Sequence, residues 1–256
     1  PQYYYFDESM VYGDERILSR DEFFKQLRTR RAYTSGVNPA LVREKFENIL
    51  KAGKDILCIT VSSGLSGSYD TVYMTALYLK GMYPDQHIEV IDSLSASLAS
   101  GFLCMDALDM KKQGKSLQET VEEIRKRVHR IDLYFVVDNF KYLVQGGRVS
   151  EAVGKIGDIL DIKLILTMKD GRIEPYRKNR GMNHALRNIR NIAQSKETAR
   201  LGAIYVGNKD MFNKCKSLVS SDCEADLNLI VSSHVGPDTT GIAIEWQAYG
   251  TADEKA

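Results

Sequence analysis

The densest group of polar residues that could bind a small ligand is a serine and glycine stretch at residues 62–68. It reads Ser-Ser-Gly-Leu-Ser-Gly-Ser, follows the apolar run Asp55 to Val61 and precedes a helical pattern. Hydroxyl groups and free backbone N–H groups at the start of a helix can bind a carboxylate or a phosphate. Serines also cap helices and fill turns, and this alternative stays open for each serine taken alone.

Other polar residues follow predicted strands in the same way. The strand at His87 to Ile91 is followed by a serine-rich loop, and a strand predicted at Leu227 to Val231 is followed by His234. Ligands of open α/β sheets bind beyond the carboxyl ends of the strands, so we expect these loops to converge. His234 could serve as a general base, hold a ligand or simply pack at the surface. The loop hydroxyls concerned are Thr34, Ser35, Ser63, Ser66, Ser93, Ser95, Ser97, Ser232 and Ser233.

Two segments of the sequence contain arginines that could bind an anion or a partner protein. Gly146-Gly147-Arg148 combines a flexible turn with a guanidinium suited to a carboxylate or phosphate, or it is an ordinary turn with a solvated arginine. Arg180, His184, Arg187 and Asn191 have the spacing of one helix face and could dock a partner. The net charge of only +1 favours a solvated face for this second group.

Composition limits the class of protein. The chain has 256 residues, 43% hydrophobic and 27% charged, which is typical of a globular protein and disfavours a basic nucleic-acid binder. No apolar run approaches the about 20 residues of a membrane-spanning helix. The 4 cysteines form no C-x-x-C pair, so neither a zinc site nor a metal cofactor is expected. A reducing, cytoplasmic location is the simpler interpretation.

The spacing of apolar residues predicts alternating strands and helices. Ser19 with Glu22, and Ser116 with Glu119, predict capping boxes, and Asn38-Pro39 predicts another helix start. Lys169-Asp170-Gly171 predicts a hairpin turn. This pattern favours an α/β fold with largely parallel sheets, in two units that meet around residues 130–150. Strands are predicted at 3–6, 10–12, 55–61, 87–91, 133–137, 163–168, 172–176, 201–206, 227–231 and 242–246, and helices at 19–31, 38–52, 69–82, 98–112, 116–128, 140–145, 151–161, 182–194 and from 208.

Several longer motifs resemble the DegV family of bacterial proteins, which hold one fatty acid between two α/β domains. They are collinear over nearly the whole chain, so the sequence is identified as a member of this family. The motifs are TSGVNP at Thr34 to Pro39, ITVSSGLSGSY at Ile59 to Tyr69, VIDSLSAS at Val90 to Ser97, FVVDNFKYLVQGGRVS at Phe135 to Ser150, IKLILTMKDGRI at Ile162 to Ile173 and HVGPDTTGI at His234 to Ile242.

The resemblance implies two segregated α/β domains, at residues 1–135 and 136–256, with the lipid between them. It implies that hydroxyls of Thr34, Ser35 and Ser66 hold the carboxylate, with Ser63 and Ser93 nearby and His234 close to the headgroup. Arg148 and Arg180 are then expected on a side that faces a partner. That partner is an ATP-dependent fatty acid kinase, which converts a presented palmitate or oleate into an acyl-phosphate. The chain itself is then a lipid-binding subunit without catalytic residues, cofactor, nucleic-acid partner or integral membrane association.

Three departures from the family pattern affect these expectations. Family members begin with a strand that ends in a D-S-T-like motif, and no such motif occurs here, so we expect a truncated chain or an absent first strand. Asp238 follows HVGP where glycine is usual, which adds a negative charge near the expected mouth of the site. Gly181 follows Arg180 where threonine is common. The last two bear on the choice of partner more than on lipid binding.

Two other functions compete with this interpretation. Ser66, Asp138 and His234 occur in the chain order of the α/β-hydrolases, which predicts a serine hydrolase for a lipid ester or acyl substrate. The nucleophile motif G-x-S-x-G is not matched, because the second glycine is displaced in Gly64-Leu65-Ser66-Gly67-Ser68. A nucleic-acid-binding role rests only on the basic residues from Arg177 to Arg190, without a recognised module.

Overall fold

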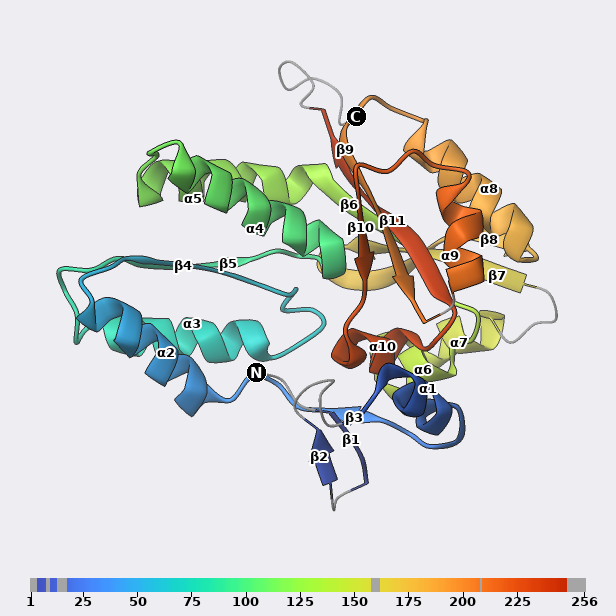
Figure 1. Ribbon diagram of the computed structural model, residues 1–256, viewed down its shortest axis with the longest axis horizontal. Helices are drawn as coiled ribbons and strands as arrows, with labels where there is room; N and C mark the ends of the chain where they lie inside the picture. The colour runs from blue at the N-terminus through green and yellow to red at the C-terminus, as the bar shows by residue number, and fades with distance from the viewer. Residues whose placement is uncertain (1–3, 8–9, 13–17, 158–161, 208, 248–256) are drawn as a thin grey trace.

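The computed structural model describes residues 4–7, 10–12, 18–157, 162–207 and 209–247. Three sheets of strand order β2-β1-β3, β4-β5 and β10-β9-β11-β6-β7-β8 organise this part of the chain (Figure 1). The strands are β1 Tyr4–Asp7, β2 Met10–Tyr12, β3 Tyr33–Thr34, β4 Ile56–Thr60, β5 Ile88–Asp92, β6 Ile131–Val136, β7 Ile162–Lys169, β8 Arg172–Arg180, β9 Thr198–Val206, β10 Cys223–Asp226 and β11 Thr239–Trp246. The helices are α1 Arg20–Thr29, α2 Pro39–Lys51, α3 Ser68–Lys80, α4 Ser97–Lys112, α5 Leu117–Arg127, α6 Lys141–Gln145, α7 Glu151–Gly157, α8 Met182–Ala193, α9 Lys209–Lys216 and α10 Leu229–Val235, with a short 3-10 helix at Val128–Arg130.

The β4–β5 pair forms a small parallel sheet covered by helices on both faces. Residues 56–60 pair in register with residues 88–92, and α3 is the connection between the two strands. Figure 1 shows α2 and α3 on one side of the strands and α4 and α5 on the other. Ile56, Ile88 and Val90 pack against Phe46 and Leu79 of α2 and α3. The apolar run predicted as a buried strand is therefore covered from both sides, as such a run requires.

The six-stranded sheet is mostly antiparallel, so the prediction of largely parallel sheets is wrong for it. Only β9 and β10 pair in parallel. A parallel pair needs a crossover that carries the chain back along the strand. Between β6 and β7 lie two short helices, α6 with 5 residues and α7 with 7 residues. They span about 8 Å and about 10 Å, against about 20 Å for β6, so neither helix runs back along the whole strand. The Asp170-Gly171 turn then joins β7 to β8 as the predicted hairpin.

The two faces of this sheet belong to different apolar clusters. Leu133, Phe135 and Ile204 pack in the largest core cluster, toward α4 and α10. Tyr134 of β6, which lies between Leu133 and Phe135, and Ile165 of β7 face the opposite side, toward α8 and α9, in a second cluster. Because both faces are buried, each strand contains consecutive apolar residues, at 133–136 in β6, 164–166 in β7 and 242–244 in β11.

The described residues up to position 34, namely 4–7, 10–12 and 18–34, lie beside the second half of the chain rather than beside β4–β5. β3 pairs with β1, and α10 contacts β1, β3 and α1 (Figure 1). The predicted boundary between residues 135 and 136 falls inside β6, all of which belongs to the six-stranded sheet. A division before Ile131 keeps that strand whole.

Capping residues start several helices as predicted. Ser19 accepts from the N–H of Glu22, Asn38 from that of Ala40, and Ser116 forms a complete capping box with Glu119.

The predicted strand at 227–231 is wrong, because Asn228 caps the helix α10 by accepting from the Val231 N–H. The predicted single helix face from Arg180 to Asn191 is also wrong, since Arg180 ends β8 and Gly181 precedes α8. Residues 158–161 of one predicted helix lie outside the described residues.

Candidate functional site

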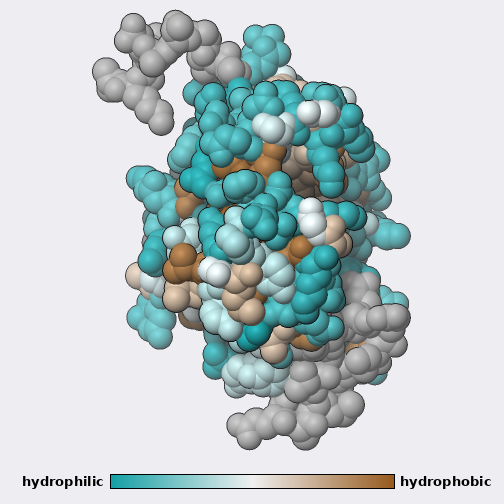
Figure 2. Space-filling view, turned by 90° about the vertical axis from the view of Figure 1, so that its left-hand side faces the viewer, coloured by the Kyte–Doolittle hydropathy of each residue, from teal (hydrophilic) through white to brown (hydrophobic). Residues whose placement is uncertain are grey.

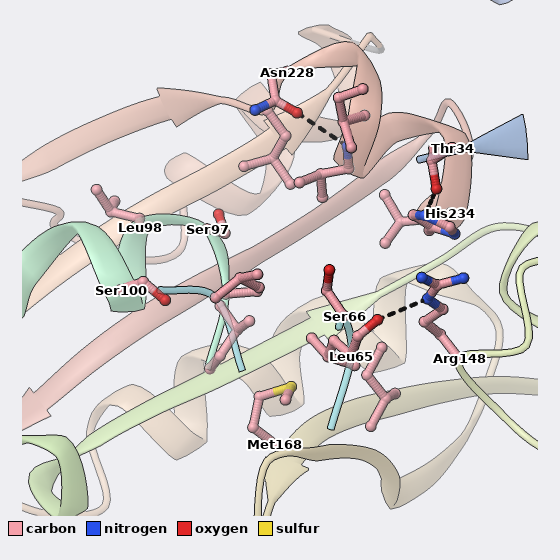
Figure 3. A pocket seen from close by; sticks show the side chains of 18 of the residues that line it. Thr34, Leu65, Ser66, Ser97, Leu98, Ser100, Arg148, Met168, Asn228 and His234 are labelled. Carbon is pink, nitrogen blue, oxygen red and sulfur yellow. Dashed lines mark hydrogen bonds between the residues drawn. The ribbon is translucent and has the colours of Figure 1, made fainter. Parts of the chain in front are cut away.

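A cavity of about 710 Å³ lies where the carboxyl ends of β4 and β5 meet the six-stranded sheet. Its wall is mainly apolar, and polar side chains gather at its ends. Figure 3 shows Thr34, His234, Ser66 and Arg148 toward one end, with Leu98, Ser97 and Ser100 toward the other and Met168 below. Four separate segments therefore bring predicted site residues together: the end of β3, the 62–67 loop, the turn after α6, and α10.

The apolar wall comes from elements of both halves of the chain. Its members lie on the carboxyl end of β4, on α4, on one face of the six-stranded sheet and on α10. Side chains at alternating positions of a strand share a face, so β6 presents both Leu133 and Phe135 to the cavity. The apolar lining residues are Ile59, Val61, Leu65, Ala96, Leu98, Leu133, Phe135, Leu143, Met168, Ile173, Ile204, Ala225, Leu227, Ile230, Val231 and Val235.

The 62–67 loop is fixed against the β7–β8 turn by close backbone contact. The Ser62 hydroxyl donates to the Gly171 carbonyl at 2.6 Å. A Cβ at Gly64 would lie 2.4 Å from the Gly171 oxygen, so only glycine allows this approach. Ser66 then lies just before α3, where its Oγ accepts from the Ser68 N–H at 3.2 Å and lies 2.8 Å from the Ser68 Oγ. The N-cap residue of α3, Gly67, has no capping side chain, so the helix end faces the cavity.

Thr34 and His234 meet across the polar end of the cavity. The Thr34 Oγ1 and the His234 Nε2 are 2.9 Å apart, and the His234 Nδ1 is buried without a hydrogen-bond partner. A Cβ at Gly146 would lie 2.5 Å from this Nδ1, so the glycine makes room for the ring. Burial, with a smaller contribution from the Arg148 charge, lowers the pKa of His234 to about 4. The imidazole is therefore neutral at neutral pH.

Arg148 lines the cavity and is held by backbone carbonyls. Its Nε donates to the Leu65 carbonyl at 3.0 Å, and its Nη1 donates to the Gly146 carbonyl. Burial lowers the pKa of its guanidinium. This side chain therefore connects the loop that carries Ser66 to the turn that accommodates His234.

Three predicted residues lie outside the cavity lining. Ser63 is exposed, and its N–H donates to the Asp92 carboxylate at 3.2 Å. Ser93 is buried, and its Oγ lies 2.8 Å from the Oγ of Ser100, which does line the cavity. Arg180 is exposed at the end of β8. Ser35, in contrast, lines the cavity beside Thr34.

The lining also contains polar residues outside the predicted carboxylate site, among them Ser97, Ser100 and Asn228. Of these, only Ser97 is among the loop hydroxyls identified from the sequence. Ser97 begins α4 with a left-handed backbone of φ 57°, and its buried Oγ has no hydrogen-bond partner. The serine-rich loop signal pointed to this region, but residue type gave no indication of the left-handed backbone. Asn228 was hidden by the incorrect strand prediction.

The contacts of a serine hydrolase triad are not formed. His234 bonds Thr34 rather than Ser66, and Asp138 pairs with Lys163 at 2.7 Å instead of orienting the imidazole. Within the described residues, no group of three or more His, Cys, Asp or Glu is placed to hold a metal ion. The same part of the chain has no helix long and apolar enough to cross a membrane.

The fold and the site together define an α/β protein with a large, mainly apolar ligand cavity that has polar ends. The chain belongs to the DegV family: the model of this family of uncharacterised proteins matches residues 5–247. A DegV domain-containing protein of Caldanaerobacter subterraneus subsp. tengcongensis is 30% identical over 245 residues, 91% of this chain and 86% of that protein.

Solved structures agree with this fold. A DegV lipid binding protein from Thermotoga maritima is 25% identical with a TM-score of 0.82, and the match covers 98% of this chain and 91% of the other. The fatty acid kinase B3 protein of Streptococcus pneumoniae, loaded with linoleic acid, is 22% identical with a TM-score of 0.83. That match covers 96% of this chain and 90% of the other.

Proposed function

We propose that this protein binds one long-chain fatty acid in the cavity, between two α/β lobes, with the carboxylate at the end that carries Thr34, Ser35, Ser66 and His234. The observation that carries the proposal is the cavity itself, whose about 710 Å³ combine a long apolar wall with a cluster of hydroxyls. The similarity to structures described as lipid binding and as loaded with linoleic acid supports it.

The apolar wall supplies the affinity. Each buried CH₂ contributes about 0.8 kcal/mol, so the chain of palmitate or oleate contributes on the order of 10 kcal/mol before the entropy of binding is subtracted. Strand and helix side chains from both lobes surround this chain in the proposal. Met168 adds a flexible thioether that adapts to the shape of an alkyl chain.

The polar end of the cavity provides hydrogen-bond donors for a buried carboxylate. An ionised group that leaves water needs several hydrogen-bond donors. The Thr34, Ser35 and Ser66 hydroxyls can donate in this way, as can the N–H groups of the first turn of α3 after that of Ser68, which already donates to Ser66. The dipole of α3 also favours an anion there. Arg148 adds a cation in the cavity wall. Ser93 contacts Ser100 toward the other end of the cavity (Figure 3), and the Ser63 N–H orders the 62–67 loop through Asp92.

We further infer that the protein presents the carboxylate to a separate ATP-dependent kinase. The printed name of the Streptococcus pneumoniae neighbour, a fatty acid kinase B3 protein, supports this role. In that reaction the carboxylate oxygen attacks the γ-phosphorus of ATP, ADP leaves, and an acyl-phosphate forms. Arg180, exposed at the end of β8, is the residue proposed to face the kinase. The catalytic groups then belong to the partner and not to this chain.

Native mass spectrometry of the purified protein tests the binding function. We expect a mass increase of one fatty acid per chain, which is lost on denaturation and identified in the released lipid. A lipid-stripped sample should regain the increase when palmitate or oleate is added. A mass that stays at the value of the bare chain after palmitate is added, and also after oleate is added, contradicts the proposal.

A further inference from the structure

β5 has an unpaired outer edge. Among the described strands it pairs only with β4, through bonds such as the Ile56 N–H to the His87 carbonyl and the Ser93 N–H to the Thr60 carbonyl. In this parallel register the N–H and C=O groups of Ile88 and Val90 point away from β4. Such a row of free backbone groups is a template for another strand.

A groove of about 310 Å³ runs along this edge, between α3 and α5. One wall is apolar and aromatic and belongs to α3, the floor is β5, and Arg125 of α5 forms the other wall. The groove therefore has the shape and chemistry to receive a strand and the helices that would accompany it. Its lining residues are Tyr69, Tyr73, Ala76, Leu77, Lys80, Ile88, Glu89, Val90 and Arg125.

α3 is apolar on its outward face as well as on its buried face. Its outward side chains at positions 73, 74, 77 and 78 are Tyr, Met, Leu and Tyr, with exposed fractions of 47%, 60%, 54% and 54%. Figure 2 shows hydrophobic residues gathered at the level of α2 and α3, whereas the level of α4 and α5 is mainly hydrophilic. A helix that is apolar all round is normally covered by another element.

α5 carries a charge pattern that is complementary to itself. Its first half holds Glu119, Glu122 and Glu123, and its second half holds Arg125, Lys126 and Arg127. Glu122 is exposed and lies three residues before Arg125, which lines the groove, so the two side chains share one face of the helix. Glu119 accepts from Ser116, and Glu123 pairs with Arg127 and Arg130 in the same chain. The exposed charges that meet when two such helices run antiparallel are therefore those of Glu122, Arg125 and Lys126.

We propose that a second copy of this chain occupies the groove, with β5 of one protomer antiparallel to β5 of its partner about a twofold axis at Val90. This register places Ile88 opposite the partner's Asp92 and keeps the two Glu89 side chains from facing each other. Neighbouring strands lie about 4.8 Å apart and packed helices 8–10 Å apart. The two α3 helices, each over its own β5 and β4, then meet at packing distance, and the two α5 helices pair their opposite charges.

The Glu89 side chain does not prevent this pairing. Lys80 and Arg125 contact it at 3.4 and 3.2 Å, across the edge of the strand. All three side chains are partly exposed, and exposed ion pairs of this kind contribute little to stability. Their rearrangement is therefore a small loss compared with the covering of the apolar face of α3.

Sedimentation equilibrium of the full chain tests the proposal. We expect a dimer whose dissociation constant rises at least about tenfold in Arg125→Glu, which sets like charges against each other across the axis. Glu122→Arg combined with Arg125→Glu restores opposite charges and should bring the dissociation constant back toward that of the unaltered protein. This rescue separates pairing across the axis from simple damage to α5.

Leu77→Lys, on the outward face of α3, should give a monomer. Leu108→Lys on α4 is its control, because Leu108 is 58% exposed, close to the 54% of Leu77, and lies outside the groove. The control should remain dimeric, and thermal unfolding of all variants should stay cooperative. A monomer at every accessible concentration overturns the proposal, and so does a dimer that tolerates both Leu77→Lys and Arg125→Glu.

Discussion

Thr34 and His234 lie 200 residues apart in the chain and share a 2.9 Å contact at the polar end of the cavity. The contact joins the second residue of β3 to the last turn of α10. Since the imidazole is neutral, one of its ring nitrogens carries a hydrogen and the other accepts. The Thr34 hydroxyl is free to donate to a carboxylate when the His234 Nε2 carries the hydrogen and donates to the Thr34 Oγ1.

Ser66→Ala should weaken fatty acid binding. A hydrogen bond to a charged group contributes about 1.5–3 kcal/mol, which corresponds to a dissociation constant raised roughly 10-fold to 100-fold. Calorimetric titration of the lipid-stripped protein with oleate measures this change. Ser217→Ala is a control, since its hydroxyl bonds the Lys214 carbonyl outside the cavity lining. An oleate affinity equal to that of the control would remove Ser66 from the carboxylate site.

Gly146→Ala should displace His234 and weaken oleate binding while leaving the fold intact. The new Cβ would lie 2.5 Å from the His234 Nδ1, closer than such atoms approach in proteins. Gly81→Ala is the matched control, because its Cβ would meet the Tyr78 carbonyl at an ordinary 3.6 Å. Equal oleate affinities in the two variants would show that the ring position does not matter for binding.

The protein should lose stability as the pH falls from about 6.5 to about 4, because the folded state holds His234 neutral. In this range the unfolded chain binds a proton at this residue and the folded chain does not, so the free energy of unfolding falls with falling pH. The contribution is fully present above pH 6.5 and amounts to about 3 kcal/mol. Urea unfolding across this range should show a smaller pH dependence for His234→Asn. Parallel pH curves for the two proteins would refute the assignment.

Ser97→Gly should raise the free energy of unfolding by about 0.5–1 kcal/mol, because glycine adopts a left-handed backbone without strain. The serine hydroxyl has no partner to lose. Ser100→Gly is the opposed control: it lies within α4, where glycine costs about 1 kcal/mol. Thermal unfolding should move in opposite directions for the two variants, and a loss of stability in both would contradict this account of residue 97.

Much of the fold could be predicted from the sequence where local signals and burial agree. Strands covered on both faces, such as β4 and β6, are short apolar runs, and Ser19, Asn38 and Ser116 mark helix starts. The strand predicted over Leu227 to Val231 failed because a short apolar run suits either a buried strand or a buried helix. Asn228 favours the helix, because its side chain accepts a capping hydrogen bond from the Val231 N–H. The strand prediction considered the apolar run and not this capping residue.

The polar end of the cavity could be predicted better than its wall. Thr34, Ser35, Ser66, Arg148 and His234 lie in loops or at element ends, where their motifs are recognisable, and all of them line the cavity. The wall depends on which strand faces turn toward β4 and α4. The packing of the six-stranded sheet against β4, α4 and α10 decides this, and it brings together residues as distant as Ile59 of β4 and Ile230 of α10.

The largest core cluster joins both halves of the chain. It contains Phe23, Ile91 and Phe102 from the first half together with Leu164 and Ala243 from the second. Cutting the chain near residue 130 would therefore expose apolar surface on both pieces, so neither is expected to be stable alone. The two lobes should unfold as a single cooperative unit, which ties the survival of the lipid cavity to the stability of the whole molecule.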